Sequence, residues 1–358
     1  MPNHSAGLVM GVLGVGRIGR MHAAHLALHP DVATVVLLGR HAERLRNALP
    51  QIAGMAVESE QHGSAAHEVT SKLLPRVFRT SAQNLGVDLR MDGLVVATST
   101  DSHTALVTEA AGLGVPLLIE KPLASSDEEQ VKLIKTLDES GVQCMMGYHR
   151  RFDDDHRRLR RQVQSGALGA PRGAVAVSLD FRDAAESYVP TSGGLWRDLA
   201  VHDFNALAWI LDEQIVSVSA RSGVLANPMY EKHNDVDTAS ATLTFSSGVV
   251  ANILCGRHMG WRQETRLEVH GTEGSDSTDA VSRGSRTHVL EGDNAPRKSF
   301  TSSLDRFKKA YINEIDEFVK LAQGLGEVDS PPAACLAALR VAQAAEQSSR
   351  TGRTVRVG

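Results

Sequence analysis

Short apolar runs alternate with amphipathic stretches along the first 148 residues. The runs have the length of buried strands, and the stretches between them carry apolar residues at helical spacing. Strands that alternate with helices in this way predict an α/β fold with a doubly wound parallel sheet. The predicted strands are 8–13, 32–38, 93–98, 115–120 and 142–148.

A different pattern begins at Pro171, where apolar and polar residues alternate one by one. This alternation is typical of strands that bury a single face. Ser246-Ser247-Gly248 lies between two of these stretches and predicts a hairpin turn. The predicted strands are 173–181, 216–225, 239–245, 249–255 and 266–270.

Two helices are predicted near the end of the chain. Residues 304–321 carry apolar side chains on one face, with Ser303 as the N-cap, and an alanine-rich stretch at 333–349 forms the second helix. The change of pattern divides the chain into two domains, residues 1–148 and 149–358.

Residues 50–75 interrupt the α/β alternation. We expect an inserted surface loop with a short helix at 65–74, before a strand at 76–79, because proline and glycine break helices. Whether this insertion is a lid, an oligomer contact or neither stays open. His62 and His67 within it are expected to be solvated, since no third metal ligand is close in sequence. The helix-breaking residues are Pro50, Gly54 and Pro75.

Composition narrows the classes of function. A formal net charge of −4 argues against binding to nucleic acid. The three cysteines are scattered without a C-x-x-C pair, which is typical of a reducing compartment and gives no zinc site. No apolar run approaches the ~20 residues of a membrane span, and no signal peptide is recognisable, so we expect a cytoplasmic protein without a membrane partner.

A glycine motif follows the first predicted strand. Gly14, Gly16 and Gly19 form G-x-G-x-x-G, and an amphipathic stretch comes next. In this context the first glycine allows a tight turn, the second lets backbone approach a pyrophosphate, and the third lets the helix pack against the strand. We therefore predict a dinucleotide at the start of this helix, with Arg17 and Ile18 among its contacts.

The end of the second predicted strand distinguishes NAD from NADP. An acid there binds the adenosine ribose of NAD, whereas an arginine accommodates the 2′-phosphate of NADP. The strand runs into Gly39-Arg40-His41 without an acid, and Arg44 follows. Two guanidinium groups would offset the charge of a phosphate, so we predict NADP or NAD as the cofactor, with NADP favoured. The alternative is that Arg40 is a solvated turn residue and Glu43 reaches the ribose.

Polar residues follow the strand at 93–98. Ligands of open parallel sheets lie beyond the carboxyl ends of the strands, so Thr98, Thr100 and His103 are predicted to line the cofactor crevice. The same segment also fits a helix start, with Asp101 or Ser102 as the N-cap.

Further motifs are spread over nearly the whole chain. They are Gly14-Val15-Gly16-Arg17-Ile18-Gly19, Thr98-Ser99-Thr100-Asp101-Ser102-His103, Glu120-Lys121-Pro122, Gly147-Tyr148-His149-Arg150-Arg151-Phe152, Ser192-Gly193-Gly194-Leu195-Trp196-Arg197-Asp198, His202-Asp203-Phe204 and Arg350-Thr351-Gly352-Arg353. Together they resemble the glucose–fructose oxidoreductase/inositol dehydrogenase family (Gfo/Idh/MocA), and most of all its inositol 2-dehydrogenase branch. The resemblance implies an N-terminal Rossmann domain and a C-terminal α+β domain with a large, mostly antiparallel open sheet.

The resemblance also implies the chemistry. Lys121 would lie next to the nicotinamide and the reacting carbon, Glu120 would be a cofactor contact, and the Lys121–Pro122 bond would be cis. The implied catalytic set is Lys121, Asp198 and His202. Asp198 and His202 are four residues apart, so on a helix the carboxylate can orient the imidazole, which takes the proton of a hydroxyl. Lys121 can stabilise the developing alkoxide.

Other residues of these motifs have less defined roles. Asp203 points about 100° away from His202 around a helix, so it is either a substrate contact or structural. Arg257 and Trp261 stand where inositol dehydrogenases carry an arginine and an aromatic segment, with a loose match. The candidate residues of the substrate pocket, besides the catalytic set, are Tyr148, His149, Arg151, Trp196, Tyr230 and His233.

We therefore expect an NAD(P)-dependent oxidoreductase that transfers a hydride between a secondary hydroxyl of a cyclitol or sugar and the nicotinamide. The resemblance implies a homodimer or homotetramer formed through the C-terminal sheet. Three alternatives stay open: a sugar dehydrogenase or reductase, a lyase or hydrolase that uses transient oxidation and retains its cofactor, and a nucleotide-sensing regulator. A sensor would need none of Lys121, Asp198 and His202.

Overall fold

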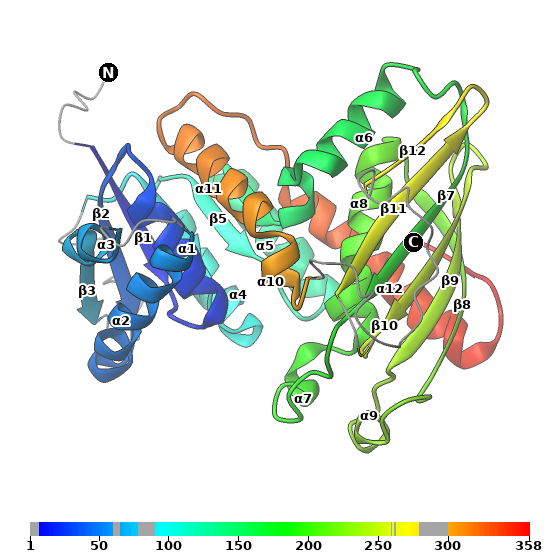
Figure 1. The fold of residues 1–358 in the computed structure, drawn as a ribbon, viewed down its shortest axis with the longest axis horizontal. Helices are drawn as coiled ribbons and strands as arrows, with labels where there is room; N and C mark the ends of the chain where they lie inside the picture. The colour runs from blue at the N-terminus through cyan, green and yellow to red at the C-terminus, as the bar shows by residue number, and fades with distance from the viewer. Residues whose placement is uncertain (1–6, 60–64, 78–89, 259, 261–262, 279–299) are drawn as a thin grey trace, which may run out of the picture. The chain divides into compact units, whose positions relative to one another are not determined.

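The computed structural model divides the chain into two compact units, the first formed by residues 1–148 and 311–336 and the second by 149–310 and 337–358 (Figure 1). Residues 311–336, which the sequence pattern assigns to the second domain, therefore belong to the first unit. The described residues are 7–59, 65–77, 90–258, 260, 263–278 and 300–358. Two residues named above, His62 and Trp261, lie outside them.

The first unit contains a sheet of six parallel strands in the order β3-β2-β1-β4-β5-β6. The order reverses next to β1, which is where such sheets bind their ligands. The predicted doubly wound parallel sheet is confirmed. Its strands are β1 (Leu8–Leu13), β2 (Val32–Gly39), β3 (Leu73–Val77), β4 (Gly93–Val96), β5 (Leu117–Glu120) and β6 (Cys144–Gly147).

The helices between these strands are α1 (Arg17–Leu28), α2 (Ala42–Ser59), α3 (Ala65–Lys72), the 3₁₀ turn η2 (Thr100–Ser102), α4 (His103–Ala111) and α5 (Asp127–Ser140). Ser126 caps the start of α5, because its hydroxyl accepts from the Glu129 amide at 3.2 Å and donates to the Glu129 carboxylate at 3.0 Å.

The prediction of an inserted loop at residues 50–75 is wrong for residues 50–59, which are helical. Helix α2 continues through Pro50 and Gly54 to Ser59. Its apolar face carries residues such as Leu45, Ile52 and Ala56, all buried, and this packing outweighs the low helix propensity of the two breakers. The strand predicted at 76–79 begins earlier, as β3 at Leu73.

The second unit contains a seven-stranded sheet in the order β12-β11-β7-β10-β9-β8-β13. All neighbours are antiparallel except β7 and β10, so the sheet is mostly antiparallel, and β9 and β10 form the predicted hairpin. Its strands are β7 (Pro171–Leu179), β8 (Ile215–Gly223), β9 (Thr238–Phe245), β10 (Val250–Gly256), β11 (Glu264–Gly271), β12 (Ser275–Ser277) and β13 (Val355–Arg356).

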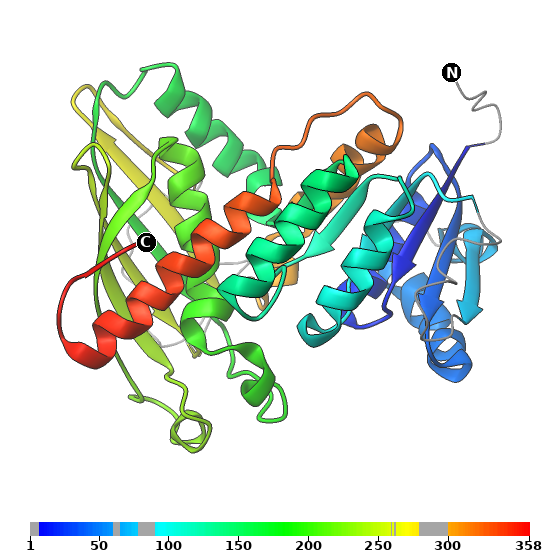
Figure 2. The ribbon, with the colours of Figure 1, turned by 180° about the vertical axis from the view of Figure 1, so that it is seen from behind.

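Helices cover one face of this sheet (Figures 1 and 2). Alternate strand residues, such as Ala176, Leu243 and Ile253, bury their side chains in that layer, which forms the core of the unit. The helical segments of the unit and of the chain end are η3 (His149–Phe152), α6 (Asp154–Gln164), α7 (Val189–Ser192), η4 (Trp196–Ala200), α8 (Val201–Leu211), α9 (Met229–Lys232), α10 (Ser303–Arg306), α11 (Lys308–Ala322) and α12 (Pro332–Thr351).

The helix predicted at 304–321 is two helices, α10 and α11, separated at Phe307. Its N-cap is Ser302 rather than Ser303, since the Ser302 hydroxyl accepts from the Asp305 amide at 3.1 Å. From Tyr311 onward α11 belongs to the first unit. There the centroid of the Tyr311 ring lies 6.1 Å from the centroid of the His22 ring. Across the described residues, the structure has no helix with both the length and the apolar character of a membrane span.

Candidate active site

A cavity of about 840 Å³ opens at the carboxyl ends of β1, β2 and β4. Five residues predicted to bind the cofactor line it: Gly14, Gly16, Arg40, Arg44 and Thr98. Since these residues come from three separate loops that meet beyond the sheet, the cavity lies where an open parallel sheet holds its ligand.

The glycine motif has the geometry that dinucleotide binding requires. Gly14 has a φ of +100°, and a Cβ there would lie 2.6 Å from the Ala97 carbonyl oxygen. A Cβ on Gly19 would lie 2.0 Å from the Gly14 carbonyl oxygen, so only glycine lets α1 approach the turn this closely. Gly16 has open space beside it, at the position where a pyrophosphate would approach the start of α1.

Positive side chains gather at the β2 side of the cavity. Arg40 and Arg44 line it, and so does Arg20 of α1, which the sequence analysis does not single out. Glu43, the alternative ribose ligand, is not among the lining residues. Among the described residues, no acid from the segment after β2 lines the cavity, and the acid that does line it is Glu109 of α4.

His103 has a different environment from the one predicted for it. It is buried outside the cavity lining, and its Nδ1–H donates to the carbonyl oxygens of Pro122 and Leu123 at 3.0 and 3.3 Å. Burial lowers the pKa of His103 below its usual value, which keeps the ring neutral. The other cofactor candidates that do not line the cavity are Arg17, Ile18, Gly19, Thr100, Glu120 and Lys121.

Lys121 follows the last residue of β5, and its peptide bond to Pro122 is cis, as the family resemblance implies. His103 bonds the carbonyl of Pro122, and the Leu123 amide donates to the Cys335 sulfur at 3.4 Å. The backbone on the carboxyl side of Lys121 is therefore held by side chains from α4 and α12.

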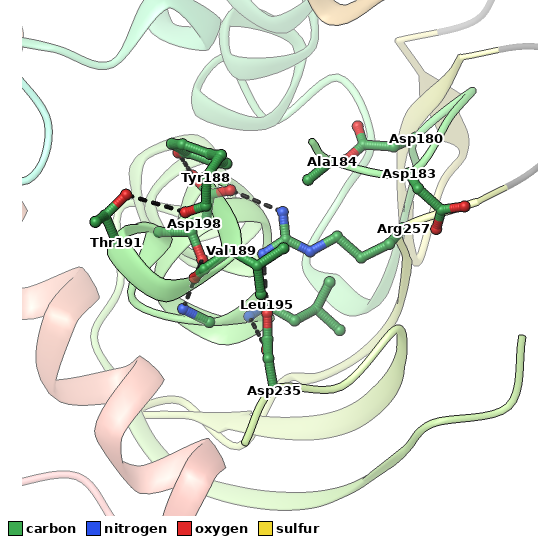
Figure 3. Close-up of polar contacts among 12 residues, drawn as sticks. Asp180, Asp183, Ala184, Tyr188, Val189, Thr191, Leu195, Asp198, Asp235 and Arg257 are labelled. Carbon is green, nitrogen blue, oxygen red and sulfur yellow. Dashed lines mark hydrogen bonds and ion pairs between the residues drawn. The ribbon is translucent and has the colours of Figure 1, made fainter. Parts of the chain in front are cut away.

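In the second unit, Asp198 is part of a network of charged side chains (Figure 3). Its Oδ1 accepts from the Tyr188 hydroxyl at 2.9 Å, and its Oδ2 accepts from Arg257 Nη1 at 2.8 Å. Arg257 is 2% exposed and also reaches Asp235 at 3.4 Å. Burial disfavours the guanidinium, but the charges of Asp198 and Asp235 outweigh it and raise the pKa of Arg257.

The turn that carries Asp198 is not an ordinary α-helix. Residues Trp196–Ala200 form a π-helical turn, η4, which leads directly into α8 with His202 in its first turn. The Leu195 amide, at the start of this turn, donates to Asp235 at 2.8 Å. The centroids of the His202 and His149 rings lie 4.9 Å apart, and residue His202 is 8% exposed. Wider helical turns of this kind are frequent at functional sites.

Asp203, whose role the sequence leaves open, is structural. Its carboxylate is 1% exposed and accepts from Arg150 at 2.5 Å and from the Ser178 hydroxyl at 2.9 Å. The Cys255 thiol approaches its other oxygen at 3.6 Å. The ion pair therefore joins η3 and α8 to two strands of the sheet inside the core.

Several predicted substrate residues are buried in packing contacts. Arg151 donates to Asn205 at 2.9 Å and lies over the Trp209 ring, while Trp196 stacks on Phe204. The Tyr148 hydroxyl donates to the Cys335 sulfur at 3.6 Å. The substrate roles of Tyr148, Arg151 and Trp196 stay predictions.

Three further residues, Tyr188, Asp235 and Asp180, surround Arg257 and Asp198 and are not predicted from the sequence (Figure 3). Burial raises the pKa of Asp180, whose carboxylate accepts from Gln263 at 2.9 Å. The sequence carries no signal for this group, because Asp180, Asp198 and Asp235 are far from Arg257 along the chain.

The chain is similar to known proteins over nearly its whole length. A family model described as an oxidoreductase family with an NAD-binding Rossmann fold matches residues 8–148, and one described as the GFO/IDH/MocA C-terminal domain matches residues 156–276. A myo-inositol dehydrogenase of Streptomyces leeuwenhoekii is 30% identical over 96% of this chain and 98% of its own. An inositol 2-dehydrogenase of Rhizobium meliloti is 28% identical over 97% and 98%. The crystal structure of a myo-inositol dehydrogenase from Corynebacterium glutamicum has a TM-score of 0.81 at 28% identity, covering 98% of this chain and 99% of that one.

Proposed function

Since the chain belongs to the GFO/IDH/MocA oxidoreductase family, we propose that it is an NAD(P)-dependent dehydrogenase that oxidises a secondary hydroxyl of a cyclitol or sugar. The observation that carries the proposal is the cavity at the ends of β1, β2 and β4, with its glycine turn and its open space beside Gly16. The relatives named as inositol dehydrogenases support a cyclitol as the substrate.

The residues of the chain have separate tasks in this proposal. Gly14, Gly16 and Thr98 hold the dinucleotide, which supplies the hydride acceptor when bound. Lys121 donates a hydrogen bond to the reacting oxygen and stabilises its negative charge as the proton leaves. His202 takes that proton, because imidazole is the usual base near neutral pH.

Asp198 binds a substrate hydroxyl rather than serving as the base. Its two oxygens already accept from Tyr188 and Arg257, and the guanidinium favours the ionised carboxylate. A carboxylate has about four lone-pair sites, so Asp198 retains capacity to accept from a hydroxyl.

We further propose that NADP is preferred over NAD. The cavity places Arg40 and Arg44 beside the end of β2, where a 2′-phosphate would lie, and Glu43 is not part of the lining. Planar guanidinium groups bind phosphate oxygens through paired hydrogen bonds.

We also propose a homo-oligomer formed through the sheet of the second unit. One face of that sheet packs on helices, and the other exposes Val216, Val250 and Leu254, which are 38%, 40% and 42% exposed. A sheet face that no helix of its own unit covers can serve as an interface with a second copy of the chain. Sedimentation of the full-length protein would measure the assembly, and loss of the oligomer on Leu254→Lys would support this face.

The function is tested by absorbance of the reduced nicotinamide, with NAD and NADP in parallel and a panel of inositols and hexoses. Turnover of an inositol with NADP supports both proposals. Turnover with NAD alone contradicts the 2′-phosphate argument and keeps the dehydrogenase. Cofactor binding without turnover of any polyol favours a lyase, a hydrolase or a sensor instead.

A further inference from the structure

Three titratable side chains meet inside the first unit, from α1, the end of β5 and α11. His22 Nε2 lies 2.6 Å from Glu120 Oε1. One ring nitrogen of His22 and one carboxylate oxygen each of Glu120 and Glu314 lie within 4.8 Å of one another. His22 and Glu314 are 0% exposed, while Glu120 is 14% exposed at its side chain. None of the three lines the dinucleotide cavity.

Glu314 is the unusual member of this cluster. Neither of its carboxylate oxygens has a hydrogen-bond partner among the described residues. An ionised carboxylate without water, donors or a countercharge is costly, and the negative charge of Glu120 adds repulsion. Burial and Glu120 together raise the pKa of Glu314 well above its usual range. Something must neutralise Glu314, either a cation or a proton.

The distance between His22 and Glu120 decides between these two. A metal ion binds imidazole nitrogen and carboxylate oxygen at about 2.0–2.2 Å, which holds the two ligand atoms about 3 Å or more apart. The observed 2.6 Å is the length of a direct, charge-assisted hydrogen bond, in which His22 Nε2–H donates to Glu120. No cation fits between these atoms, which leaves a proton on Glu314.

The cluster is connected to Lys121 through the chain. Glu120 is the last residue of β5 and the neighbour of Lys121 in the chain. A Cβ on Gly147 of the adjacent strand β6 would lie 2.9 Å from the Glu120 carboxyl carbon, so this carboxylate is packed flat against β6. The direction of the Glu120 side chain is therefore set by Gly147 on one side and by His22 on another.

We propose that Glu314 is held as a neutral carboxylic acid and acts, through Glu120 and His22, as a positioning residue for Lys121. The proposal rests on the proposed function, in which Lys121 contacts the reacting oxygen. The carboxyl oxygens of Glu314 and Glu120 that form the cluster lie within 4.8 Å of each other, so a neutral Glu314 can turn its proton toward the Glu120 carboxylate. Together with the hydrogen bond from His22, such a contact would fix the end of β5. An ionised Glu314 would instead repel Glu120 and displace the residue that follows it.

The protonation state is tested by infrared difference spectroscopy between the full-length wild type and Glu314→Gln. We expect the carbonyl band of a protonated carboxylic acid in the wild type that the Gln variant lacks. Subtraction removes the contribution of Asp180, another buried carboxyl whose pKa is raised. Glu317→Gln, on the same helix at a partly exposed position, is the matched control and should leave the band unchanged. A wild type without the band, or a stoichiometric metal ion that Glu314→Gln loses, would overturn the proposal.

The positioning role is tested by kinetics of the same variants together with Glu314→Leu. Glu314→Gln preserves a neutral donor and should keep kcat within about threefold, whereas Glu314→Leu should lower kcat roughly tenfold with an unchanged Kd for the cofactor. Equal losses in both variants, or a loss of cofactor affinity, would mean a merely structural role. If the wild type turns over no polyol, the proposed function fails, while the infrared band still decides the state of Glu314.

Discussion

The dinucleotide cavity of the first unit and the Asp198 network of the second are built in opposite ways. The turn that borders the cavity depends on close backbone contacts, which a Cβ on Gly14 or Gly19 would block at 2.6 and 2.0 Å. Around Asp198 the contacts are between side chains, and Tyr188 and Arg257 are 10 and 59 residues away in sequence. The glycine turn is specified by one short motif. The side-chain network depends on the whole fold, which brings residues that are distant in sequence together.

The largest effect should come from Lys121→Ala, which separates chemistry from cofactor binding. Removing a group that stabilises a developing negative charge costs about 10²–10³ in kcat. The Kd for the cofactor should be unchanged, because Lys121 does not line the cavity. Stopped-flow absorbance and fluorescence titration measure the two quantities, with Lys132→Ala on the exposed side of α5 as the control. A variant that loses binding but retains kcat would contradict the assignment.

The second largest effect should come from Arg257→Met, which removes the ion pairs of Arg257 with Asp198 and Asp235. This change leaves the glycine turn and the dinucleotide cavity unaltered. Two carboxylates with 16% and 6% exposed side chains would lose their common countercharge, at a cost of about 3–5 kcal/mol in the free energy of unfolding. Thermal unfolding should show this loss, together with a fall in kcat/KM at constant cofactor affinity. Arg257→Lys keeps the charge and should lose less. Equal thermal shifts in both variants would show that the charge is not the stabilising feature.

A smaller effect should distinguish the two cofactors. Arg40→Ala and Arg44→Ala should each raise the Kd for NADP by about 10- to 100-fold and leave the Kd for NAD unchanged, since a hydrogen bond to a charged group contributes about 1.5–3 kcal/mol. Arg46→Ala is the matched control, because Arg46 lies on α2 as Arg44 does, is exposed and does not line the cavity. Isothermal titration with both cofactors measures the ratio. Parallel losses for NADP and NAD would point to the shared pyrophosphate instead.

The smallest effect should be a change in the pH dependence of stability. Burial lowers the pKa of His103, so the folded protein holds this ring neutral while the unfolded chain protonates it near pH 6.5. The free energy of unfolding should therefore fall as the pH drops below about 6.5 and should not depend on His103 above it. Urea denaturation from pH 8 to 5.5 should show a weaker pH slope for His103→Gln than for the wild type. An identical slope would contradict a buried neutral His103.

The two regions also differ in how far the sequence predicts them. The strand, the glycine turn and the helix at residues 8–28 are local, so their order, their contacts and the role of Gly19 follow from the motif. Spacing placed Asp198 and His202 on one helical face, but the turn at 196–200 is π-helical and the partners of Asp198 come from residues 188 and 257. Such long-range pairs have no local signal, and for the same reason the continuity of α2 through Pro50 required knowledge of its packing.

The division of the chain has a consequence for its synthesis. The first unit includes residues 311–336, so the ribosome must synthesise the chain through residue 336 before this unit has all its parts. Until then the surfaces that α11 covers, including the region around Gly93 that contacts Phe318, stay open to water and to other nascent chains. The first unit is therefore not encoded by one continuous segment. A chimeric protein that takes this unit from a relative needs both segments, residues 1–148 and 311–336.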